Sequence, residues 1–172
     1  MNNLKKPYIA KLIDGLSIYI GNIISWLTLI IVIITAFIVV LRYVFNLSPI
    51  WLQESLIWVH GIIFMCGSSY TLQNDSHVRV DVVYRKLDKK QKTLINLLGT
   101  ILFIFPFCFF LFSESLEYVI SSWQIKEVSR NSGGMIYPFI PILKTSLLIM
   151  PITIFLQGIS IVTTSLNLLR KT

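Results

Sequence analysis

Residues 15–41 read GLSIYIGNIISWLTLIIVIITAFIVVL, a run of 27 residues without one charged side chain. A hydrocarbon core about 30 Å thick needs roughly 20 apolar residues of helix at 1.5 Å per residue. Three further apolar stretches of this kind follow along the chain. The sequence therefore predicts an all-α integral membrane protein with four transmembrane helices, and residues 1–172 form a single membrane domain. The expected spans are 19–41, 49–72, 94–113 with helix continuing beyond it, and 141–169.

The composition agrees with a membrane protein and excludes several other classes. Hydrophobic residues make up 55% of the 172 residues, and the mean hydropathy is +0.74. One small water-soluble core cannot bury this much apolar surface, so lipid or another protein must cover it. The net charge of +7 comes from short clusters beside the spans, which suits a membrane surface and not a nucleic acid. Cys66 and Cys108 both fall inside expected spans, so they support neither a disulfide framework nor a zinc site.

The distribution of Lys and Arg predicts the orientation of the chain in the membrane. With four spans, both termini and the connection between the second and third spans share one side. That side holds 11 of the 15 Lys and Arg residues, and the other side holds 4. Short positively charged loops stay in the cytoplasm, so both termini are expected to be cytoplasmic.

Two connections are longer than a simple turn requires. The connection 73–93 carries apolar residues from Val80 to Leu87 at helical spacing, which predicts a short helix on the cytoplasmic membrane surface. Asp88 and Gln91 can form a capping box at the start of the third span. The connection 114–144 begins as a helix and breaks at Asn131-Ser132-Gly133-Gly134, which predicts a periplasmic elbow.

Few ionisable residues lie inside the expected spans, and each is a functional candidate by default. Arg42 and Glu54 lie at similar distances on either side of the first turn, so an ion pair between the first two helices is the simplest account. A transport role for Glu54 stays open. His60 projects about 240° away from Glu54 and is expected to pack between helices, as are Trp26 and Trp58.

Polar residues recur at helical spacing on the first and fourth spans. Such stripes mark helix contacts in lipid, because small and hydroxyl residues let backbones approach and bond. The contact could be within the chain or with a partner. The first stripe is Gly21, Thr28, Thr35 and Arg42, and the second is Thr153, Gln157, Ser160, Thr164 and Asn167.

Three short motifs carry a family resemblance. They are LRYVFN at 41–46, WLQE at 51–54 and HVRVD at 77–81. With four spans and inside termini, the chain resembles the small membrane subunit of tripartite ATP-independent periplasmic (TRAP) transporters.

That resemblance implies a complex in the bacterial inner membrane. A large membrane subunit would carry the Na⁺ and substrate sites, and a periplasmic binding protein would deliver an organic acid or similar solute. This chain would be a scaffold in contact with lipid, with no cofactor of its own. Arg42 and Glu54 would fix the first hairpin, and His77, Arg79 and Asp81 would anchor the cytoplasmic loop.

Two other functions stay open from the residues themselves. A stand-alone, proton-coupled drug exporter would use Glu54 as its proton site, and a structural anchor would serve another membrane complex. An enzyme is not expected, because the sequence has no Walker loop, nucleophile elbow, zinc motif or dinucleotide-binding glycine pattern.

Overall fold

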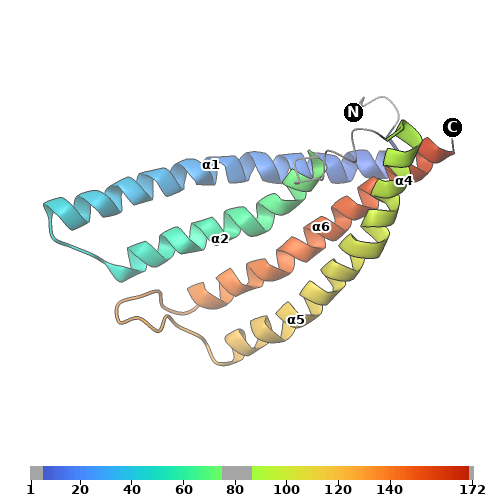
Figure 1. Ribbon diagram of the computed structural model, residues 1–172. Coiled ribbons are helices and arrows are strands. Elements are labelled where there is room, and N and C mark those ends of the chain that lie inside the picture. The colour runs from blue at the N-terminus through green and yellow to red at the C-terminus, as the bar shows by residue number, and fades with distance from the viewer. Residues whose placement is uncertain (1–5, 75–86, 171–172) are drawn as a thin grey trace.

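The computed structural model describes residues 6–74 and 87–170, and every regular element among them is a helix (Figure 1). Four helical segments are long and apolar enough to cross a membrane, which confirms the expected all-helical fold with four possible spans. The third of these segments is continuous but has three parts, α4, a π-helix η2 and α5. The bounds are α1 Tyr8–Val44, α2 Ile50–Gln73, α4 Lys89–Gly99, η2 Thr100–Ile104, α5 Phe105–Gln124 and α6 Phe139–Leu169.

The spans lie side by side in the order α1, α2, α6, α5, so the last helix of the chain sits between the second and third spans (Figure 1). They form an open layer with α1 and α5 at its edges, and α1 also contacts α6 near its N-terminal end. A layer leaves two broad faces uncovered by the chain. Accordingly, no more than 28% of the most apolar window of any span is buried.

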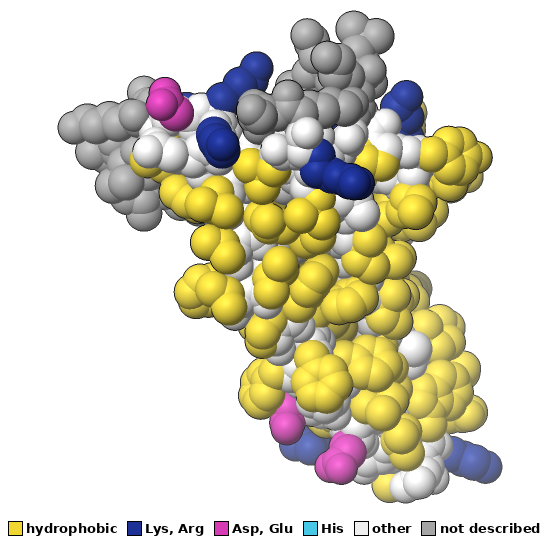
Figure 2. Space-filling model, turned by 90° about the vertical axis from the view of Figure 1, so that its right-hand side faces the viewer, with side chains coloured by type: hydrophobic (Ala, Val, Ile, Leu, Met, Phe, Trp, Pro, Cys, Tyr) yellow, Lys and Arg dark blue, Asp and Glu magenta, His cyan; other side chains and the backbone are white. Residues whose placement is uncertain are grey.

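Both termini lie at one end of the layer, here called the termini end, and residues 125–138 form a loop at the opposite, loop end (Figure 1). Hydrophobic side chains dominate the surface in Figure 2, and charged side chains are confined to its upper and lower parts. This distribution suits a chain that crosses a bilayer. Which end faces the cytoplasm stays a prediction.

The helix of the third span begins at Lys89 and continues beyond the expected span 94–113 to Gln124, in line with the predicted continuation. Its start confirms the predicted capping box, in which the Asp88 backbone amide donates to Gln91 Oε1 at 3.0 Å. The π-helix ends two residues before Pro106, which has no amide proton for the α-helical ladder. The wider π turn accommodates this break without ending the helix.

Small residues bring the helices together. Gly21 of α1 faces the Tyr70 ring of α2 so closely that a Cβ atom would overlap it. Most of the buried polar residues are serines, as expected where close backbone approach replaces the hydrophobic effect. They include Ser17, Ser69, Ser115, Ser122, Ser146, Ser160 and Ser165.

The predicted surface helix between the second and third spans falls almost wholly on residues 75–86, outside the described residues.

Candidate functional site

The carboxylate of Glu54, one turn into α2, fastens the loop between α5 and α6. It accepts hydrogen bonds from the Ser129 hydroxyl, from Asn131 Nδ2 at 2.9 Å and from the Met135 backbone amide at 2.6 Å. Two of the three donors are side chains of the loop and one is its backbone. Glu54 therefore ties α2 to a segment more than 70 residues away in the sequence.

Glycine is needed where this loop passes Glu54. A Cβ atom on Gly134 would lie 2.7 Å from Glu54 Oε1 and closer still to Ser129. The loop also closes on itself, because the Ser129 amide donates to the Met135 carbonyl at 2.9 Å and the Gly134 amide to Asn131 at 3.0 Å. The predicted break at 131–134 is thus a hydrogen-bonded turn, in which Gly133 has a φ of +78°.

The ion pair predicted between Arg42 and Glu54 is wrong. Arg42 is exposed near the end of α1, and the bonds of Glu54 go to the loop. The physical reason is the direction in which Glu54 points. Trp58, four residues on and hence on the same face of α2, contacts α6. Glu54 consequently faces the α6 side of the layer and not α1.

Trp58 packs between helices as predicted. Its indole N–H donates to the Phe139 carbonyl at 3.0 Å, and its ring meets the Phe139 ring edge-on at 6.5 Å. Trp26, for which the same was predicted, is 71% exposed on α1. In a membrane an outward indole is covered by lipid or a partner, so its apolar character does not demand burial within the chain.

A second polar cluster at the loop end joins α5, the loop and α6. Lys144 Nζ donates to Glu127 Oε2 at 2.5 Å and lies 3.8 Å from the centroid of the Tyr118 ring. The Ser122 hydroxyl donates to the same Glu127 oxygen at 2.6 Å. The bond from Lys144 and then that from Ser122 hold the pKa of the Glu127 carboxyl below its usual value.

A buried polar cluster at the termini end joins α1 to α6. Asp14 is only 6% exposed and forms an ion pair with Lys6. Its Oδ1 accepts from Gln157 Nε2 at 2.9 Å and from the Ser160 hydroxyl at 2.7 Å. The Ser17 hydroxyl donates to Gln157 Oε1 at 2.9 Å. Together these bonds satisfy a carboxylate that would be costly to bury alone.

This cluster shows what the polar stripe on the fourth span contacts. Gln157 and Ser160 bond to α1 of the same chain, and Thr164 is 9% exposed. The Thr164 hydroxyl has no hydrogen-bond partner among residues 6–74 and 87–170. The middle of this stripe thus serves contact within the chain.

The stripe on the first span behaves differently. Gly21 is buried against Tyr70, but Thr28, Thr35 and Arg42 are exposed. Three of the four residues of this stripe are therefore available for contact with another molecule.

Sequence reasoning missed Asp14 as a site residue. A signal was present, because Ala10, Asp14, Ser17 and Gly21 fall on one helical face of α1, and all four are buried. A lone acid on a stripe of small residues, in an otherwise basic segment, indicates a buried partner. His77, Arg79 and Asp81 lie outside the described residues.

The prediction that His60 packs between helices is wrong for this chain on its own. His60 is exposed on α2, and it makes no hydrogen bond or ion pair within the described parts of the chain.

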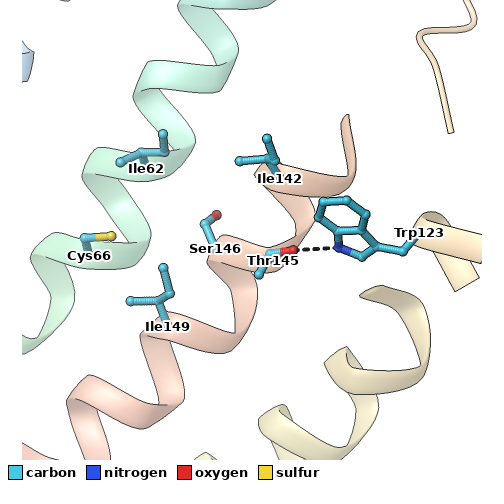
Figure 3. Close-up of a pocket in the computed structure, with 7 residues that line it drawn as sticks. All are labelled: Ile62, Cys66, Trp123, Ile142, Thr145, Ser146 and Ile149. Atoms are coloured by element: carbon cyan, nitrogen blue, oxygen red, sulfur yellow. Dashed lines mark hydrogen bonds between the residues drawn. The ribbon is translucent and has the colours of Figure 1, made fainter. Parts of the chain in front are cut away.

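An apolar cavity of about 250 Å³ lies between α2, α5 and α6, lined by the seven residues of Figure 3. Its polar groups are already engaged. Thr145 accepts from Trp123 Nε1 at 3.0 Å and donates to the Pro141 carbonyl, and Ser146 donates to the Leu143 carbonyl. The cavity consequently suits an apolar group better than a polar solute. Its lining is Ile62, Cys66, Trp123, Ile142, Thr145, Ser146 and Ile149.

Among the described residues, no group of three or more His, Cys, Asp or Glu side chains is placed to hold a metal ion.

Comparison with known proteins adds one match. A family model described as "Tripartite ATP-independent periplasmic transporters, DctQ component" matches residues 31–162, which is 132 of the 172 residues. The matched region includes α2, α5, the loop that Glu54 holds and most of α6. No curated protein and no solved structure gave a match.

Proposed function

Because the chain belongs to the DctQ family, the small membrane component of TRAP transporters, we propose that it is the scaffold on which a large membrane subunit works during solute uptake. As a member of this family it is a multi-pass membrane component of a transporter and not an enzyme. The proposal extends to a location in the bacterial inner membrane with cytoplasmic termini. The large subunit would supply Na⁺ coupling and the site for an organic acid or similar solute.

The observation that carries the scaffold role is the open layer. Four spans side by side leave two faces uncovered, and few of their apolar side chains are buried by the chain itself. A flat, largely exposed helical surface fits a subunit that completes its packing against a larger membrane protein. Specific helix contact in lipid needs such close-packing surfaces.

The loop end supports a second part of the proposal, a contact with the periplasmic binding protein. Glu54 and the Lys144–Glu127 pair fix residues 125–138 to three helices. A fixed loop costs less entropy to engage than a free one, so it is suited to docking. In the proposed orientation this loop faces the periplasm.

The exporter alternative is not favoured by the geometry of Glu54. Its carboxylate already accepts three hydrogen bonds from one loop, whereas a proton site must exchange its proton with solvent or substrate. Membership in a tripartite transporter family also assigns the chain to a larger assembly.

The deciding experiment is purification of the tagged chain from its native host in mild detergent. We expect one large polytopic membrane protein to be recovered in stoichiometric amount, and deletion of the chain to abolish uptake of the organic acid that the host takes up through this system. Re-expression of the chain should restore uptake. Recovery of the chain only with itself, together with dye efflux that Glu54→Gln abolishes, would overturn the proposal in favour of an exporter.

A further inference from the structure

The feature that carries a further inference is the outward face of α2. Ile57 and Phe64 are 67% and 63% exposed, and His60 lies between them and is also exposed. Spacings of three and four residues place these side chains on one face of the helix. The face therefore presents an imidazole flanked by two large apolar groups.

His60 lies at bilayer depth. It is ten residues after Ile50, the start of the 24-residue α2, which places it about 15 Å along the helix and near its midpoint. A hydrocarbon core about 30 Å thick has its centre at this depth. Lipid tails offer no hydrogen-bond partner there, and the described parts of the chain offer none either. An unsatisfied polar group in hydrocarbon is costly, so another molecule must supply the partner.

The opposite side of α2 does not need a hydrogen-bond partner from another molecule at this depth. Ile62 and Cys66 line the cavity of Figure 3 and project about 200° and 240° around the helix from His60. The hydroxyls that line this cavity are bonded within α6 or to Trp123. The two faces of the layer thus differ, and only the His60 side has an unmet hydrogen bond at this depth on α2.

We propose that the face formed by Ile57, His60 and Phe64 is where the large membrane subunit packs, with a hydrogen-bonding group of that subunit opposite the His60 imidazole. This inference rests on the proposed function, since it names the surface through which the scaffold meets its partner. A lipid tail lacks the required polar group. A second copy of the chain could pair imidazole with imidazole, because a neutral ring both donates and accepts, but the family match assigns the chain to an assembly with different subunits.

Photocrosslinking in the intact membrane tests the surface directly. A benzoylphenylalanine residue would replace Phe64 on the proposed face and, in a matched control, Phe109 of α5. Phe109 is also aromatic, is 76% exposed and lies near the middle of the third span, but on an edge helix of the layer. We expect a crosslinked product of this chain with the large subunit from position 64, at several-fold higher yield than from position 109.

A substitution pair tests the role of the imidazole. His60→Leu removes the hydrogen bond while keeping an apolar side chain, and His60→Gln keeps a donor and an acceptor. Loss of one cross-helix hydrogen bond should weaken recovery of the large subunit by roughly three- to thirtyfold in His60→Leu. His60→Gln should retain most of it, with the amount of this chain in the membrane unchanged in both variants.

The outcomes separate this inference from the proposed function. If the large subunit copurifies but crosslinks equally from both positions or only from position 109, the surface is wrong and the function stands. A crosslinked homodimer from position 64 would assign the face to a second copy. If no large subunit copurifies with the unmodified chain, the proposed function itself fails.

Discussion

The backbone amide of Met135 donates a 2.6 Å hydrogen bond to the carboxylate of Glu54, across 81 positions of the sequence. It joins the beginning of α2 to the loop that precedes α6, and these two helices are neighbours in the layer. One acid on a helix thus defines the shape of the segment at the loop end.

Glu54→Gln should loosen this loop, because an amide cannot accept from all three donors that the carboxylate satisfies. We expect a lower free energy of unfolding and faster proteolysis within residues 125–138. Thermal melting in detergent and limited proteolysis measure the two effects. Glu117→Gln is the matched control, since Glu117 is exposed on α5. If residues 125–138 are cleaved at the same rate in both variants, Glu54 does not hold the loop in place.

Asp14→Asn should separate α1 from α6 at the termini end. The substitution leaves Lys6 without its ion-pair partner and sets an amide beside the amide of Gln157. The expected cost is about 1–3 kcal/mol of unfolding free energy, seen as a lower melting temperature. Lys11→Gln on the same helix is exposed and should melt like the unmodified chain. A normal melting temperature for Asp14→Asn would show that the buried cluster contributes no net stability.

Gly21→Ala should weaken the contact between α1 and α2, because its Cβ atom would overlap the Tyr70 ring. Overpacking of this kind typically costs about 1–3 kcal/mol. Gly15→Ala, in the same helix, meets nothing within 4 Å and should be neutral or slightly stabilising. Comparing their melting temperatures isolates the helix contact from the general effect of glycine, and the reverse order would contradict the close approach.

The Lys144–Glu127 pair should make stability depend on acid pH. The pKa of Glu127 is lowered from 4.5 in the folded chain, so the pair stabilises the fold fully above that value. The stabilisation is lost as pH falls through the lower, folded pKa. The difference in melting temperature between the unmodified chain and Glu127→Gln should therefore shrink as pH drops below about 4.5. A difference that stays constant across this range would mean that the ionised carboxylate does not matter.

The proposed orientation is tested by labelling single cysteines in a chain whose native Cys66 and Cys108 are replaced by alanine. Ser132→Cys in the loop should react with an impermeant maleimide added to spheroplasts. Lys90→Cys, at the start of α4, should react only when inverted vesicles are used. The opposite pattern would mean that the chain has the reverse orientation, with the Glu54-bound loop in the cytoplasm.

The local features of the fold were predictable from the sequence, and the packing was not. Long apolar runs locate the spans, and the capping box of Asp88 and Gln91 was recognised because its residues are three positions apart. The neighbours of each helix depend on contacts such as that of Glu54 with Met135, which no periodicity records. The failed prediction for Trp26 has a related cause. In lipid an apolar residue gains little from burial in protein, so hydrophobicity identifies a span without indicating its inward face.

The order of the helices in the layer bears on how the protein is made. Helix α6 contacts α1, α2, α4, η2 and α5, yet it leaves the ribosome after the other three spans. Until α6 enters the membrane, α2 and α5 lack the helix that lies between them and contacts both. Assembly of the full layer must therefore wait for α6, and a chain that ends before Phe139 would leave the α1–α2 pair without its connection to α5.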